Sequence, residues 1–129
     1  MSEAPPRVFK TKAFARFAGR QGIEDEDLCD AAALVGAGRV DADLGGGVLK
    51  QRIARKGKGK SGGFRVIVFF RRGTSAFFVY GFAKSDRDNI APDELRAFRG
   101  LAAHMLSVNE AGLSAAVGNG TLQEVECHA

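Results

Sequence analysis

Basic side chains gather in the middle of this chain, in a pattern suited to binding a polyanion. The 129 residues carry a net charge of +4, and the interval between Asp43 and Asp86 contains no acidic residue. Ten of the nineteen basic residues lie in that interval: Lys50, Arg52, Arg55, Lys56, Lys58, Lys60, Arg65, Arg71, Arg72 and Lys84. The flanks hold the other nine together with all fifteen acidic residues. This asymmetry is expected of a surface that binds nucleic-acid phosphates.

Lysines and arginines at such a surface are suited to cutting RNA as well as binding it. Attack by a neighbouring 2′-hydroxyl needs one group that accepts its proton, another that protonates the leaving oxygen, and cations that stabilise the crowded phosphorane. Lysine among other cations has a lowered pKa and can also accept the proton. The sequence shows no histidines or carboxylates with metal-ligand spacing, so we expect a metal-independent reaction and no cofactor.

The elements that must position these residues follow from hydrophobic periodicity and from glycine and proline. The pattern predicts strands at 7–10, 48–54, 63–71, 75–83 and 121–125, and helices at 12–20, about 24–35, 92–106 and 109–117. We expect a turn at 43–47 and a flexible, solvent-facing loop at 55–62. This is an α+β pattern, with two helices before an antiparallel meander.

Alternation assigns the faces of the two central strands. Phe64, Val66, Val68 and Phe70 are expected on one face of their strand, and Arg65, Ile67, Phe69 and Arg71 on the other. In the next strand we expect Phe78, Tyr80, Phe82 and Lys84 to share a face. Core packing is favoured over base stacking for these aromatic residues, because a sheet covered by helices must bury one face.

Length and composition indicate one domain over residues 1–129, with no export signal and no membrane span. The longest apolar stretch, Ala76 to Ala83, is too short to cross a bilayer. Cys29 and Cys127 lack a CxxC or metal-like spacing, which favours reduced thiols and a cytoplasmic protein, although the sequence leaves one disulfide open.

Three segments carry a family resemblance: DADLGGGVLK (41–50), KGKGKSGGFR (56–65) and AFFVYGFAKSDRDNI (76–90). With the preceding helices, they resemble the RelE/ParE superfamily of toxins, in particular its HigB-like RelE branch. The resemblance implies a RelE-like fold: a small, twisted, mainly antiparallel sheet with two N-terminal helices and C-terminal helices packed against it. It also implies a type II toxin that cuts mRNA at the ribosome, a helix-turn-helix antitoxin, a toxin–antitoxin hetero-oligomer, and no membrane partner.

The resemblance also assigns residues to the reaction. Arg65 is expected to pair with the scissile phosphate, and the other catalytic candidates are Lys60, Lys84 and Arg87. RNA-binding candidates are Lys12, Arg16, Lys50, Arg52, Lys56 and Lys58. The family's tyrosine after the last basic cluster is replaced by Ala91, while Tyr80 lies within a predicted strand. The general acid is therefore unassigned, and His128 is a minor candidate for it.

Two other functions fit the same sequence. ParE relatives share the fold but inhibit DNA gyrase without cutting RNA, and a non-catalytic module would bind RNA or the ribosome alone. The lysine-glycine loop at 56–60 can also be a solvated turn with no function, since it lacks the spacing of a phosphate-binding loop.

Overall fold

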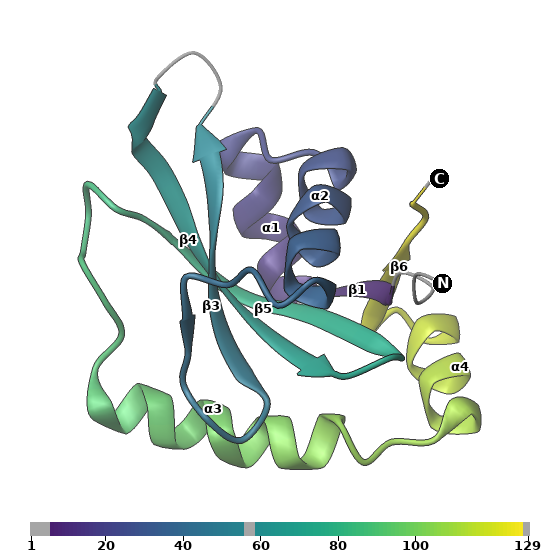
Figure 1. The fold of residues 1–129 in the computed structure, drawn as a ribbon. Helices are drawn as coiled ribbons and strands as arrows, with labels where there is room; N and C mark the ends of the chain where they lie inside the picture. The colour runs from purple at the N-terminus through teal and green to yellow at the C-terminus, as the bar shows by residue number, and fades with distance from the viewer. Residues whose placement is uncertain (1–5, 56–58, 128–129) are drawn as a thin grey trace.

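The computed structural model describes residues 6–55 and 59–127, with the backbone alone at 55 and 59–62. Its elements, in chain order, are β1 (Arg7–Thr11), α1 (Lys12–Gln21), α2 (Asp25–Gly36), β2 (Ala42–Asp43), β3 (Val48–Arg55), β4 (Gly59–Arg71), β5 (Ser75–Ala83), α3 (Pro92–Met105), α4 (Glu110–Gly118) and β6 (Leu122–Val125). Figure 1 shows α1 and α2 on one side of the sheet and α3 running along the other.

Local sequence signals set the ends of the helices. The Thr11 side chain accepts a hydrogen bond from the Phe14 amide at the start of α1, and Gly22 ends that helix in the left-handed conformation. At the start of α3, the Glu94 carboxylate accepts a hydrogen bond from the Ala91 amide at 2.7 Å. Within the described residues, no helix combines the length and the hydropathy needed to span a membrane.

The sheet has the strand order β2-β3-β4-β5-β1-β6. β1 pairs in parallel with β5, and the other neighbouring strands are antiparallel. The prediction of an α+β fold with a mainly antiparallel sheet is therefore confirmed.

Each face of the sheet is covered by one pair of helices. On one face, Phe14 of α1 packs in a buried cluster with Phe64 and Phe78 of the sheet. On the opposite face, Phe69 and Phe77 pack with Ala102 of α3 and with residues of α4. The predicted faces of the central strand are confirmed, because alternate residues of β4 enter the two cores. The C-terminal helices thus complete a three-layer arrangement.

A β-bulge in β5 makes the predicted faces of that strand wrong. Val68 pairs with Phe78 but Ile67 pairs with Tyr80, so Val79 is an extra residue in the ladder. Beyond the bulge the alternation is reversed. Phe78 therefore lies under α1, whereas Tyr80 lies on the opposite face and contacts Phe98 of α3.

Two boundaries also differ from the predictions. The predicted loop at 55–62 is shorter, because β3 extends to Arg55 and β4 already begins at Gly59. Asp43, predicted within the turn, belongs to the short strand β2, and its carboxylate accepts a hydrogen bond from the Gly45 amide. Strand pairing across the sheet outweighed the turn propensity of these glycine-rich segments.

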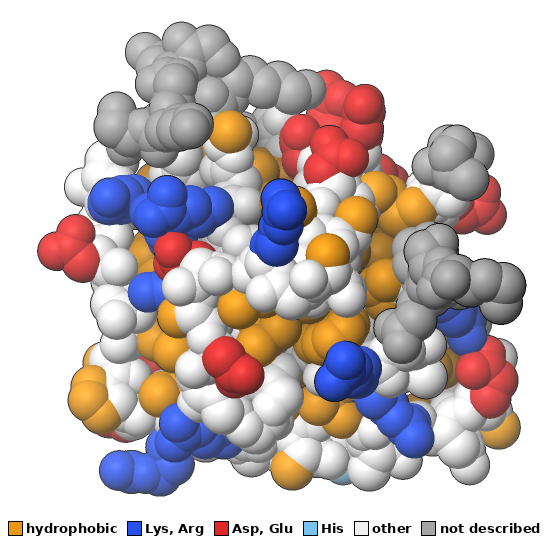
Figure 2. Space-filling model, viewed as in Figure 1, with side chains coloured by type: hydrophobic (Ala, Val, Ile, Leu, Met, Phe, Trp, Pro, Cys, Tyr) orange, Lys and Arg blue, Asp and Glu red, His pale blue; other side chains and the backbone are white. Residues whose placement is uncertain are grey.

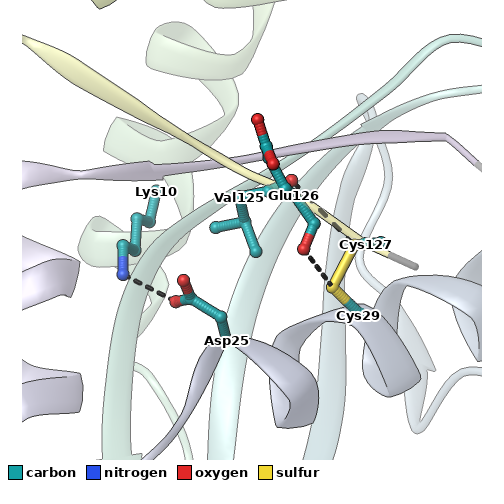
Figure 3. Close-up of a disulfide and its surroundings, with 6 residues drawn as sticks. All are labelled: Lys10, Asp25, Cys29, Val125, Glu126 and Cys127. Carbon is teal, nitrogen blue, oxygen red and sulfur yellow. Dashed lines mark hydrogen bonds and ion pairs between the residues drawn. A yellow bond between two sulfur atoms is a disulfide. The ribbon is translucent and has the colours of Figure 1, made fainter.

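Cys29 and Cys127 form a disulfide, so the prediction of two reduced thiols is wrong. Cys29 lies on α2, and Cys127 follows β6, the strand that pairs with β1 at the sheet edge beneath α2. Figure 3 shows the bridge joining this helix to the C-terminal tail, beside the Lys10–Asp25 ion pair. The fold brings the two Cα atoms to 5.6 Å across 98 residues, a proximity that spacing in the sequence does not reveal.

Candidate nucleic-acid interface

Three cations from two neighbouring strands surround one carboxylate. Asp41 Oδ1 lies 3.0 Å from Nε of Arg52, and Asp41 Oδ2 lies 3.5 Å from Nε of Arg65 and 3.7 Å from Nζ of Lys50. We call Asp41, Lys50, Arg52 and Arg65 the cation cluster. One carboxylate neutralises only one of its three positive charges, so the cluster retains a net positive charge.

Backbone contacts on both sides of Asp41 hold it at this place. The Gln51 side chain, which is buried, donates a hydrogen bond to the Arg39 carbonyl at 2.7 Å. On the other side, Ala42 and Asp43 of β2 pair with Lys50 and Leu49 of β3. The segment around Asp41 is therefore attached to β3 before and after this residue.

Arg65 lies deep in the cluster. Its side chain is 7% exposed, against 63% for Arg52, which is its direct partner across β3 and β4. The Nη1 atom lies 3.5 Å from the Phe64 carbonyl. Nη2 has no hydrogen-bond partner among the described residues. Every buried side-chain nitrogen or oxygen in those residues has a partner, so Nη2 is not a buried atom. Nη2 therefore reaches solvent.

Arg87 forms a second group beside the cluster. Its Nη2 lies 2.5 Å from Oε1 of Glu94, and its Nη1 donates to the Tyr80 hydroxyl at 3.1 Å. The guanidinium also stacks over the Phe82 ring, 5.4 Å from the ring centroid. Hydrogen bonding with Glu94 raises the pKa of Arg87 and lowers the pKa of the Glu94 carboxyl.

The two groups share one face of the sheet. Phe82, under Arg87, pairs directly with Arg65 across β4 and β5. Asn89 connects the groups, since its backbone carbonyl accepts from Arg87 Nε at 2.9 Å and its side-chain oxygen lies 3.5 Å from Lys50 Nζ. We call the cation cluster together with Tyr80, Phe82, Arg87, Asn89 and Glu94 the cationic face.

Of the residues predicted from the sequence, the cationic face includes Arg65, Arg87, Lys50 and Arg52. Lys84, at the end of β5, is exposed, and its side chain makes no hydrogen bond or ion pair with the described residues. Lys56 and Lys58 lie outside the described residues, as do the side chain of Lys60 and the whole of His128.

Lys12 and Arg16 lie elsewhere on the molecule. They border a groove with Leu101 and Met105 of α3 and with Leu122 of β6, which is separated from β3 by three strands. Figure 2 shows Lys and Arg side chains in separate groups on the visible side, several of them beside acidic side chains. The structure therefore contains a local cationic site and does not bring Lys12 and Arg16 into it.

A comparison with models of known protein families identifies the family of this chain. The family model described as the RelE toxin of the RelE / RelB toxin-antitoxin system matches residues 6–125. The chain belongs to the RelE toxin family. No curated protein matches it. As a RelE-family toxin it belongs to a toxin–antitoxin system, and membership implies an antitoxin partner.

Five residues of the cationic face in this RelE-family toxin were not predicted as site residues from the sequence: Asp41, Tyr80, Phe82, Asn89 and Glu94. Asp41 and Glu94 gave no signal, because a single carboxylate does not mark an RNA-binding surface, and Tyr80 was placed on the wrong face because alternation alone does not reveal the bulge. Among the described residues, no three His, Cys, Asp or Glu side chains lie together as candidate metal ligands.

Proposed function

We propose that this toxin is a ribosome-dependent endoribonuclease that cuts mRNA without a metal and so blocks translation. The observation that carries the proposal is the convergence of Lys50, Arg52, Arg65 and Arg87 on one face. A gyrase inhibitor needs no such gathering of cations beside a tyrosine hydroxyl. We assign the toxin to the HigB-like branch on the same segments that carry the resemblance.

The exposed and the buried cations have different roles in this proposal. Arg52 is the most exposed member of the cluster and makes the first contact with the RNA backbone. Arg65 presents Nη2 to the scissile phosphate and stabilises the charge that develops on its oxygens. Lys50, Lys56, Lys58, Lys60 and Lys84 add positive potential along the RNA path.

Tyr80 is the proton-transfer group of the cationic face in this proposal. Its hydroxyl is held by Arg87, and the residue is partly exposed. Tyr80 either accepts the proton of the attacking 2′-hydroxyl or donates a proton to the departing 5′-oxygen. A lysine or a ribosomal group carries out the proton transfer that Tyr80 does not. Arg87 keeps the hydroxyl in place while its own charge is balanced by Glu94.

The same function implies a partner and a cellular location for the toxin. We propose that residues 1–129 form one RelE-like domain that works in the cytoplasm, where its ribosomal target lies. The antitoxin is a helix-turn-helix protein that covers the cationic face in a hetero-oligomer, and an acidic or amphipathic segment would complement the charge there. Lys12 and Arg16 lie outside this face and contact ribosomal RNA.

Mapping of mRNA ends on programmed ribosomes tests the proposal. Wild-type toxin is expected to produce new ends within the coding sequence, and Arg65→Ala is expected to lower the single-turnover rate by about 100-fold or more. Arg71→Ala is the control, because Arg71 is an exposed arginine at the C-terminal end of the same strand. It is expected to retain cleavage.

Other outcomes separate the competing functions. Growth arrest with intact mRNA and altered DNA supercoiling would establish a gyrase inhibitor instead. Equal loss of ribosome binding and toxicity in Arg65→Ala would establish a binding module without catalysis.

A further inference from the structure

The acidic residue at the centre of the cation cluster has no role in the reaction proposed above. Asp41 is 15% exposed and contacts three cations at once. A carboxylate beside a phosphate-binding site opposes RNA binding by charge repulsion. Its presence within the cluster therefore needs a reason other than RNA affinity.

The sheet register supplies a reason. Arg52 and Arg65 are directly opposite each other on β3 and β4, and like charges at opposed positions destabilise a strand pair. Without a shared anion, two neighbouring guanidinium groups would move apart and lose a fixed geometry. Asp41 contacts the Nε atom of each one, so both arginines are held by the same edge of their guanidinium.

The contacts at Arg65 leave one group of donors available. Asp41 contacts Nε and the Phe64 carbonyl lies near Nη1, while Nη2 reaches solvent. The orientation of that outer nitrogen depends on the contact at Nε, because the guanidinium is planar and rigid.

We propose that Asp41 is a positioning residue for RNA cleavage, which fixes Arg65 and Arg52 by their Nε atoms so that the Nη2 atom of Arg65 points to the phosphate. This role rests on the proposed nuclease function. Asp41 does not touch the substrate, and its own position is set by β2 and by the bond from Gln51 to the Arg39 carbonyl.

Asp41→Asn tests the role, because it keeps the size of the side chain and removes its charge. The matched control is Asp43→Asn, which removes the same charge two residues away, at an exposed position on β2. At position 43 the asparagine oxygen still accepts the hydrogen bond from the Gly45 amide.

Two quantities are measured for each variant. One is the single-turnover cleavage rate on saturated programmed ribosomes, and the other is the affinity for ribosomes carrying mRNA with 2′-O-methyl nucleotides, which is not cut. Asp41→Asn is expected to lower the rate by about 10- to 100-fold. Its affinity is expected to stay or to tighten by about twofold to fivefold, because a negative charge is lost near the phosphate. Asp43→Asn is expected to change neither quantity by more than about twofold.

Several results would overturn the role. An unchanged cleavage rate in Asp41→Asn would show that the carboxylate positions nothing, and a faster rate would make it an inhibitory counter-ion. A parallel fall in rate and affinity would show a merely structural residue, and an equal effect in Asp43→Asn would show a general charge effect.

Arginine Nε–H signals in NMR spectra provide a readout that does not depend on cleavage. The signals of Arg52 and Arg65 are expected to shift strongly in Asp41→Asn and to keep their positions in Asp43→Asn. If the wild-type toxin cuts no RNA and these shifts appear, the arrangement stands and the nuclease function fails. Signals that do not respond to Asp41→Asn overturn the positioning role itself.

Discussion

Removal of the disulfide is expected to lower the stability of the toxin by several kcal/mol. The bridge between Cys29 and Cys127 closes a loop of 98 residues. In the chain-entropy account, a loop of about 100 residues corresponds to ~4.7 kcal/mol of stabilisation at 25 °C, and measured values are often about 2–4 kcal/mol. We therefore expect Cys127→Ser to lose about 3–5 kcal/mol of the free energy of unfolding.

Urea unfolding followed by far-ultraviolet circular dichroism measures this loss. Wild-type protein is compared with and without reductant, and Cys127→Ser provides the control, since it has no bridge to reduce. Reductant should lower the unfolding midpoint of the wild type to that of the variant and leave the variant unchanged. In thermal unfolding the same loss corresponds to about 10–20 °C for a chain of this size.

Thiol titration decides whether the reasoning holds. Two reactive thiols in native protein purified without reductant would show that the bridge does not form. If titration shows that reductant frees both thiols and the unfolding midpoint of the wild type does not change, closing the loop contributes no stability. The cationic face contains no cysteine, so cleavage by the folded Cys127→Ser variant should match the wild type.

Three further changes probe other parts of the structure. Tyr80→Phe is expected to lower the cleavage rate by about 100-fold while ribosome affinity stays within about twofold, because it removes the hydroxyl that Arg87 holds and keeps the ring; a parallel loss of affinity would contradict the proton-transfer role. Hydrogen bonding to Arg7 lowers the pKa of the Glu124 carboxyl from its ordinary 4.5, so this pair stabilises the fold above that pH and loses its effect as the pH falls through the lowered value. Glu124→Gln should therefore be less stable than the wild type at pH 7 and equally stable in acid, as measured by urea unfolding at several pH values, and an unchanged difference in acid would refute the sign. Gly81→Ala should cost about 1–3 kcal/mol of unfolding free energy, because the added Cβ would lie 2.4 Å from the Phe17 ring, and an unaltered urea midpoint would show that the ring moves freely.

Local patterns in the sequence were sufficient for most of the fold. The alternation from Phe64 to Arg71 assigned both faces of β4, because that strand is regular and both faces are buried. Pro92 and Glu94 marked the start of α3. Such signals act over a few residues, so a single sequence contains them in full.

Features that depend on contacts between distant residues were not accessible in this way. Alternation predicts no extra residue at Val79, so Tyr80 was placed on the wrong face. Asp41 acquires its partners only when β2 pairs with β3 and β4. The bridge from Cys29 to Cys127 likewise depends on how β6 lies beneath α2.

The extra residue in β5 divides that strand into two parts with different constraints. From Ala76 to Phe78 the side chains pack in the two cores, so changes there should act on folding and leave specificity alone. At Tyr80 and Phe82, polar and aromatic substitutions should alter the RNA chemistry in a protein that still folds, whereas Gly81 faces Phe17 of α1 and must stay small. Deleting Val79 would remove the bulge and leave Tyr80 opposite Ile67, whereas inserting one residue into the regular part of the strand would turn the side chains beyond it to the other face. Laboratory evolution of new substrate preferences should therefore conserve the length of β5 and vary only its C-terminal half.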